Sequence, residues 1–227
     1  YTNNDYGKGL SDAIQQSFEK KGGKITAVAA HEDGKADYSA EVATLASAGG
    51  DILIVAGYLD QGGRGVIQAA LDTGAFDKFM LPDGMVGESL TDHFGADIDG
   101  AIGTSPGTDS PGAAKLADMS KDKGFKGDDP YVPEAYDASA LLLLAMQSAN
   151  STDSAKYKDH VVKVANAPGE KIYPGELAKA LKILAEGGEI DYVGASDVEL
   201  IGPGEAAGNF RESVVKGGKF TTVKYHH

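Results

Sequence analysis

The sequence predicts an α/β fold with a doubly wound, mostly parallel sheet. Short apolar runs alternate with helix-spaced apolar residues through the first half of the chain, which is typical of strand–helix units. The run Asp51–Ala56 is almost entirely apolar, as expected for a parallel strand that helices cover on both faces. Glycine and proline clusters separate these segments and mark short connections. Together these observations favour a parallel sheet between helical layers.

The first nine residues, Tyr1–Gly9, have the pattern of the loop and helix start that normally follow a β-strand. Asn4 or Asp5 can cap this helix by accepting its free backbone N–H groups. An apolar face at helical spacing continues to Phe18, and Gly22–Gly23 end the helix. We expect the strand of this unit to precede Tyr1, so that the chain begins within a fold.

The other elements of the first half follow in alternation. Strands are predicted at 24–29, 51–56, 78–81 and 101–104, and helices at 38–48, 63–73 and 88–94. Asp37 is placed to cap the helix at 38–48, and Gly74 to end the helix at 63–73.

The character of the chain changes at Ser105–Gly112, where two prolines and two glycines predict a linker. Helices are predicted beyond it at 113–123, 133–148, 157–166 and 174–186. The helix at 133–148 has a wide apolar face that includes Leu141, Leu142 and Ala145, so we expect that face to be buried. Late strands are predicted at 197–201, 209–215 and 219–223, and Gly217–Gly218 predicts a hairpin turn between the last two.

Composition excludes several classes of function. The chain has 227 residues and a formal net charge of −13, which repels phosphate backbones and argues against nucleic-acid binding. Its longest apolar stretch, 138–146, is too short to cross a bilayer, so we expect no membrane span. The absence of cysteine rules out disulfides and thiol chemistry. His226 and His227 are interpreted as the remnant of a purification tag.

Three patterns that could indicate catalysis or cofactor binding fail on their chemistry. Gly103–Gly107 matches a hydrolase nucleophile elbow, but Pro106 lacks the N–H that would stabilise the oxyanion, so a linker turn is the better interpretation. Gly202–Ala207 matches a dinucleotide-binding pattern, but a strand-like segment follows it instead of a helix. The histidines lack ligand or triad spacing and are expected on the surface: His31, His93 and His160. We therefore predict no catalytic residue, no metal, no cofactor and no enzymatic activity.

One group of three residues does indicate a binding site. Tyr6 lies in the loop after the expected first strand, Tyr58 follows the strand at 51–56, and Asp83 follows the strand at 78–81. Ligands of open parallel sheets bind outside the carboxyl ends of the strands, so these three side chains are expected to converge. A carboxylate beside two aromatic rings suits a small ammonium group. Taken one at a time, each tyrosine is better explained as a cap of the sheet and Asp83 as a turn residue.

Several segments, in order along nearly the whole chain, resemble the leucine/isoleucine/valine-type solute-binding proteins of ABC transporters. They are Tyr1–Gly9, Asp37–Ser39, Asp51–Tyr58, Phe79–Gly84, Pro130–Ala138 and Asp191–Ser196. The resemblance implies a type I periplasmic binding fold, in which two α/β lobes are joined by three hinge strands. It implies that 1–107 form the second lobe, that 108–203 form the helix-rich remainder of an incomplete first lobe, and that 204–225 return to the second lobe.

The resemblance also implies a function and its residues. Tyr6, Tyr58 and Asp83 match the family's two cleft tyrosines and its ammonium-binding acid, which is glutamate in well-known members. The implied protein is periplasmic, binds an amino acid (branched-chain by default) through hinge closure, and delivers it to a membrane permease. A sensory ligand-binding domain of a receptor is the alternative, and a hydrolase is a more remote one. The family's groups for the ligand carboxylate and its signal peptide lie outside this chain, so we expect the chain alone to bind weakly or not at all.

Overall fold

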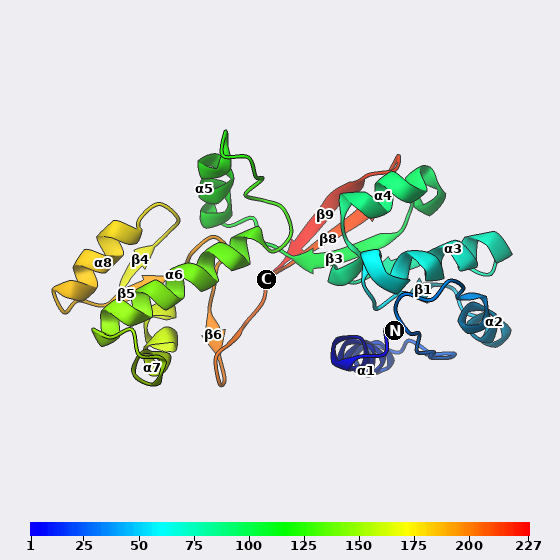
Figure 1. Cartoon of the computed structure of the whole chain (residues 1–227), viewed down its shortest axis with the longest axis horizontal. Helices are drawn as coiled ribbons and strands as arrows, with labels where there is room; N and C mark the ends of the chain where they lie inside the picture. The colour runs from blue at the N-terminus through cyan, green and yellow to red at the C-terminus, as the bar shows by residue number, and fades with distance from the viewer. The chain divides into compact units, whose positions relative to one another are not determined.

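The computed structural model describes residues 1–227 as two compact units (Figure 1). The first unit comprises Tyr1–Ser105 and Glu212–Lys224. The second comprises Pro106–Arg211 and Tyr225–His227. The backbone therefore passes between the two units at three points.

The first unit is built on a five-stranded sheet in which the strands lie in the order β1-β2-β3-β8-β9. The strands are β1 (Leu53–Ile54), β2 (Phe79–Leu81), β3 (Ile102–Pro106), β8 (Phe210–Val215) and β9 (Phe220–His226). β1 to β3 run parallel, with Leu53 paired to Phe79 and Met80 paired to Ile102. Lys216 and Lys219 close the β8–β9 hairpin around Gly217 and Gly218, whose positive φ angles of 59° and 68° are those of a tight hairpin turn.

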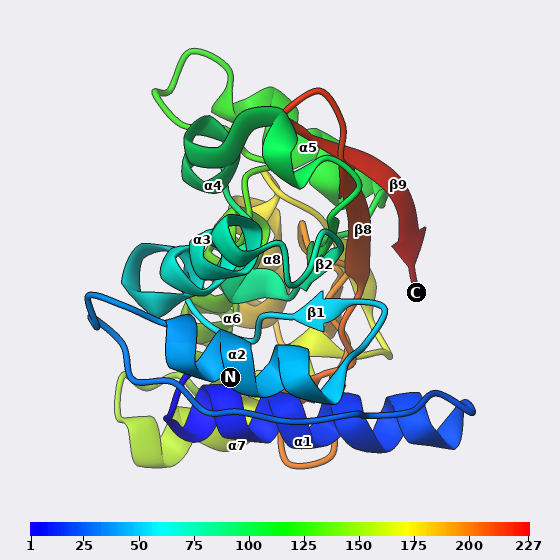
Figure 2. The ribbon, with the colours of Figure 1, turned by 90° about the vertical axis from the view of Figure 1, so that its right-hand side faces the viewer.

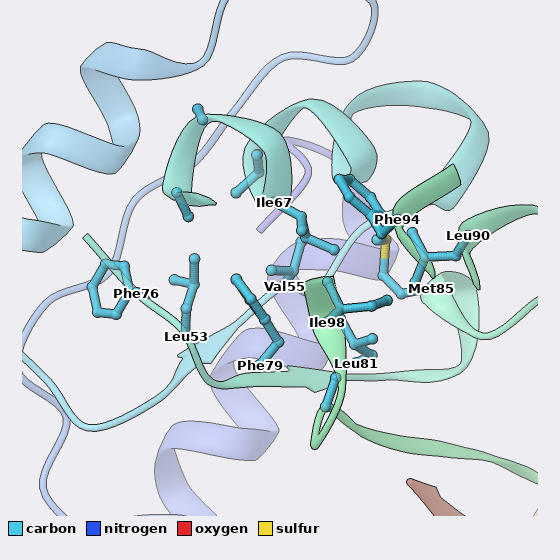
Figure 3. Packing of buried hydrophobic residues seen from close by; sticks show 14 of the residues in the cluster. Leu53, Val55, Ile67, Phe76, Phe79, Leu81, Met85, Leu90, Phe94 and Ile98 are labelled. Atoms are coloured by element: carbon cyan, nitrogen blue, oxygen red, sulfur yellow. The ribbon is translucent and has the colours of Figure 1, made fainter. Parts of the chain in front are cut away.

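Four helices belong to this unit: α1 (Asp5–Lys20), α2 (Ser39–Ala48), α3 (Arg64–Thr73) and α4 (Glu88–Phe94). Figure 3 shows the core between α3 and the sheet, where Ile67 meets Val55 and Phe79. These side chains are at most 2% exposed, and burial of each contributes about 1.5–3 kcal/mol. Asn4 caps α1 as predicted, because its side chain accepts a hydrogen bond of 2.9 Å from the N–H of Gly7.

The second unit is mainly helical. Its elements are α5 (Pro111–Ser120), α6 (Val132–Ala149), α7 (Ser154–Ala165), α8 (Leu177–Ala185), β4 (Glu170–Ile172), β5 (Ile190–Tyr192), β6 (Leu200–Ile201) and β7 (Glu205–Ala206). β4 pairs in parallel with β5, and β6 with β7 in an antiparallel hairpin. The core gathers around Leu144 of α6, Ile172 of β4 and Tyr192 of β5, all fully buried. No helix of the structure has both the length and the apolar character that a membrane crossing requires.

Several sequence-based predictions of elements are wrong in detail. The predicted strand 24–29 is not a strand in the structure, and the nearest bridge joins Thr2 to His31, just beyond the end of this segment. The segment Gly103–Pro106 lies in β3 and is not a linker turn. Leu142 of α6 is 44% exposed, so that helix buries a narrower face than predicted. β4 and β5 were not predicted, since three-residue strands carry too little alternation to be recognised.

Candidate functional site

Tyr6 is held at one edge of the first unit by the first turn of α1. Its helix begins at Asp5, directly behind the Asn4 cap. The preceding loop is fixed to the sheet, because the N–H of Thr2 donates to the carbonyl of Ala56 at 2.9 Å. The N–H of Asn3 donates to the carbonyl of His31, also at 2.9 Å. Tyr6 thus has a defined position at the carboxyl end of β1.

Tyr58 and Asp83 follow the carboxyl ends of two neighbouring parallel strands. Tyr58 comes after β1 and precedes a single π-turn, Leu59–Gly63, that leads into α3. Asp83 comes after β2 and begins the short 3₁₀ helix Asp83–Met85. Because parallel strands end at the same edge, both side chains are placed at the edge that also holds Tyr6.

The structure brings these three sequence-predicted residues into direct contact. The hydroxyl of Tyr6 donates a hydrogen bond of 2.8 Å to Oδ1 of Asp83. The rings of Tyr6 and Tyr58 are stacked, with centroids 4.9 Å apart and planes inclined by 23°. All three residues are half-buried. The result is a compact cluster of one carboxylate and two aromatic rings.

Gly84 completes the cluster, and sequence reasoning assigned it no role beyond a turn. Its N–H donates to the hydroxyl of Tyr6 at 3.3 Å, so this hydroxyl both donates to Asp83 and accepts from the backbone. A Cβ atom at this position would collide with the carbonyl of Gly57 and lie 2.9 Å from the Tyr6 hydroxyl. The close approach of the two strand ends therefore requires glycine. In the sequence, only the turn pattern Pro82-Asp83-Gly84 could have indicated that Gly84 lies at the site.

The electrostatics of the cluster keep Tyr6 in its neutral form. Burial, and then the hydrogen bond and negative charge of Asp83, raise the pKa of the Tyr6 hydroxyl well above its ordinary value. Tyr6 is therefore a permanent hydrogen-bond donor that fixes the orientation of the Asp83 carboxylate. A fixed carboxylate beside ring faces is chemically suited to a cation.

His31 is buried next to this site, so the prediction that it lies on the surface is wrong. It is 5% exposed and packs edge-to-face on Tyr38, with ring centroids 5.5 Å apart. A Cβ atom on Gly57 would lie 3.3 Å from its Nε2 atom, which shows how closely the ring approaches the backbone before Tyr58. His93 is exposed as predicted, and His160 is half-buried with its Nδ1 atom 2.8 Å from Oγ of Ser148.

A second polar cluster lies in the second unit and surrounds Asp137 of α6. This carboxylate is 2% exposed and accepts a hydrogen bond of 2.9 Å from the hydroxyl of Tyr192. The N–H of Ala195 and both the N–H and hydroxyl of Ser196 also donate to it. The cluster joins α6 to the turn after β5, and its full set of partners indicates a structural role.

The structure gives no support to the hydrolase-like pattern. Ser105 is 1% exposed within β3, whereas an elbow serine stands on a turn between a strand and a helix. No group of three or more histidine, aspartate or glutamate side chains is arranged to hold a metal ion.

Comparison with known proteins identifies the family. The family model described as "Periplasmic binding protein" matches residues 1–170. The chain belongs to the periplasmic binding protein family. A Leu/Ile/Val-binding protein homolog of Brucella suis is 30% identical to it over 180 residues, which are 78% of this chain and 42% of that protein. The chain thus spans less than half the length of this curated relative.

Solved structures show the same fold. A leucine-binding protein from Thermotoga maritima superposes with a TM-score of 0.75 at 23% identity, over 98% of this chain and 57% of that one. A branched-chain amino acid transporter substrate-binding protein from Streptococcus pneumoniae, solved with isoleucine, gives a TM-score of 0.70 at 18% identity, over 98% and 58%. The predicted α/β class with a mostly parallel sheet is therefore confirmed, as a type I periplasmic binding fold with an incomplete lobe.

Proposed function

We propose that this chain is part of an extracytoplasmic solute-binding protein of an ABC transporter, and that its first unit holds the ammonium group of an amino acid. The observation that carries the proposal is the cluster of Tyr6, Tyr58 and Asp83 at the carboxyl ends of parallel strands. Membership of the periplasmic binding protein family supports the role in solute binding.

The chemistry of the cluster matches an ammonium group. Asp83 supplies the opposite charge, and its hydrogen bond from Tyr6 fixes the carboxylate before the ligand arrives. The ring faces of Tyr6 and Tyr58 add cation–π attraction of about 0.5–2 kcal/mol. Preorganisation of this kind improves affinity because less side-chain entropy is lost on binding.

A branched-chain amino acid is the ligand we favour. Support comes from the relative named as a Leu/Ile/Val-binding protein homolog and from the similar fold solved with isoleucine. We further propose a periplasmic location, a membrane permease as partner, and capture by closure of two lobes without covalent chemistry. In this proposal residues 1–107 and 204–225 belong to one lobe and 108–203 to the other.

Calorimetric titration of the full-length protein with leucine, isoleucine and valine tests the proposal. The Asp83→Asn variant keeps an acceptor for Tyr6 but loses the charge. We expect it to weaken binding at least about tenfold, since hydrogen bonds to charged groups contribute about 1.5–3 kcal/mol. Asp72→Asn, which changes an exposed carboxylate on α3, is the matched control and should bind normally. Equal affinity of the Asp83 variant and the unmodified protein would remove the site assignment.

A further inference from the structure

His31 is a buried histidine close to the proposed site, and its ring has no hydrogen-bond partner. It lies in the segment between α1 and α2, which Figure 2 shows in blue as an extended stretch followed by a wide loop. Both ring nitrogens are buried without a partner. Because two unpaired polar atoms are costly to bury, the position of this ring needs an explanation beyond packing.

The ring of His31 packs against the backbone on both sides of Tyr58. A Cβ atom at Gly57 would lie 3.3 Å from Nε2 of the ring, and one at Gly62 would lie 2.8 Å from Nδ1. Gly57 directly precedes Tyr58, and Gly62 belongs to the π-turn Leu59–Gly63 that follows it. The close approach of the ring at both glycines means that its position and that of Tyr58 depend on each other.

Gly57 also joins the ring to the other residues of the cluster. A Cβ atom at Gly84 would collide with the carbonyl of Gly57, so the two backbones are in close contact. The N–H of Gly84 donates to the hydroxyl of Tyr6, which in turn donates to Asp83. Gly57 is therefore close both to the imidazole of His31 and to the groups that we propose for the ammonium.

Two carboxylates near the ring each keep one buried oxygen without a hydrogen-bond partner. Oδ1 of Asp33 lies 3.8 Å from Nδ1 of His31, while Oδ2 accepts from the hydroxyl of Thr2 at 2.8 Å. Glu41 of α2 is in the same state, since one of its oxygens pairs with Lys35 and the other is unpaired. These oxygens are acceptors that only a protonated ring could use fully.

Three further polar groups lie around the ring and do not alter this arrangement. Tyr38 packs edge-to-face on it, and its hydroxyl accepts from the backbone N–H of Lys35 at 3.1 Å. Glu32 is exposed, and its carboxylate accepts from the side chain of Asn3. The amino group of Tyr1 disfavours a charged ring, but burial disfavours it more, so the neutral form of the ring does not depend on that amino group.

We propose that His31 is a positioning residue of the ligand site: its neutral ring holds the backbone of Gly57 and Tyr58 in the binding geometry, and its protonation weakens amino acid binding. This inference rests on the function proposed above. Two effects act in the same direction. The charged ring is drawn to the free oxygens of Asp33 and Glu41, which disturbs its packing on the backbone, and its positive charge repels the ammonium group. Because the bound ammonium makes protonation of the ring harder, binding is tighter at higher pH.

Calorimetric titration of the full-length protein with leucine at several pH values tests the proposal. We expect the affinity to fall at least about threefold from about pH 7.5 to about pH 5, and by no more than about tenfold per pH unit, because one proton is linked to binding. His31→Phe cannot titrate and should give an affinity that does not change with pH. His93→Gln, at an exposed position on α4, should keep the pH dependence of the unmodified protein. An equal pH dependence in both variants would overturn the proposal.

NMR spectroscopy of the unmodified full-length protein tests the same proposal without a variant, and it decides if His31→Phe does not fold. As the pH falls, the amide resonances of Gly57 and Tyr58 should shift with the midpoint at which the ring resonance of His31 titrates, and that of Tyr192 in the second unit should not follow it. Saturating leucine should move this midpoint to lower pH. Amides of Gly57 and Tyr58 that ignore the titration of His31, or a midpoint that leucine does not move, would overturn the proposal.

The outcomes separate this inference from the proposed function. Leucine binding that Asp83→Asn weakens, but that does not depend on pH, would contradict the role of His31 alone. Absence of leucine binding, or equal affinity of Asp83→Asn and the unmodified protein at about pH 7.5, would instead contradict the proposed function. The response of the Gly57 and Tyr58 amides to the titration of His31 needs no ligand, so it tests the positioning role in either case.

Discussion

At the scale of single residues, the buried His31 is the unusual feature of the first unit. Neither ring nitrogen has a hydrogen-bond partner, and its nearest charged neighbour is Asp33, whose Oδ1 atom lies 3.8 Å from Nδ1. Burial is the main cause that lowers the pKa of His31, and the amino group of Tyr1 lowers it further. The fold therefore holds this ring in its neutral form beside the backbone of Gly57.

This burial predicts a loss of stability in mild acid. Because the pKa of His31 is lower in the folded chain than in the unfolded chain, the unfolded chain takes up the proton first. Stability should therefore fall as the pH drops below about 6.5, with a slope of at most about 1.4 kcal/mol per pH unit from this group. Urea unfolding at several pH values between 5 and 8 measures this dependence of stability on pH.

Two histidine variants provide the comparison for this pH dependence. His31→Phe removes the titrating ring and should flatten the slope in this range, whereas His93→Gln, at an exposed position on α4, should retain it. A slope that is the same in both variants would mean that His31 is not its source.

At the scale of elements, the Asp137 cluster is what joins the longest helix of the second unit to its sheet. α6 contributes the carboxylate, and β5 with its following turn contributes the donors Tyr192, Ala195 and Ser196. Burial and the Asp137 carboxylate raise the pKa of the Tyr192 hydroxyl, so it remains a donor. The segments Pro130–Ala138 and Asp191–Ser196, which carry part of the family resemblance, meet at this point.

Removal of this carboxylate should strongly destabilise the second unit. Asp137→Ala leaves the buried donors without an acceptor, and we expect a loss of about 3 kcal/mol or more in the free energy of unfolding. Tyr192→Phe removes a single donor and should cost about 1–2 kcal/mol. Denaturant unfolding followed by a probe in the second unit measures both. A cost for Asp137→Ala no larger than that for Tyr192→Phe would contradict the central role of the carboxylate.

Elements with strong local signals were predictable from the sequence, and contacts between distant residues were not. The Asn4 cap and the Gly217–Gly218 turn depend on local chemistry and were found. The hydrogen bond between Tyr6 and Asp83 joins residues 77 positions apart, so the strand-end rule could place them at one edge but could not supply their geometry. The burial of His31 depends on Tyr38 and on the backbone of Gly57, which no local pattern around His31 reveals.

At the scale of the whole molecule, the chain combines two units with different contents. The first carries the cluster that we propose for an ammonium group. The second carries a buried structural carboxylate. In the function that we propose, the ammonium end of the ligand belongs to the first unit, and the affinity of the whole protein depends on the charge of Asp83.

The most direct test compares two ligands that differ in the ammonium group, leucine and 4-methylpentanoate. Their affinities are measured by calorimetry for the full-length protein and for Asp83→Asn. The account predicts that the variant weakens leucine binding at least about tenfold and leaves the affinity for 4-methylpentanoate unchanged, because only leucine carries the charge that Asp83 pairs with. An equal change for both ligands, or no change for leucine, would contradict it.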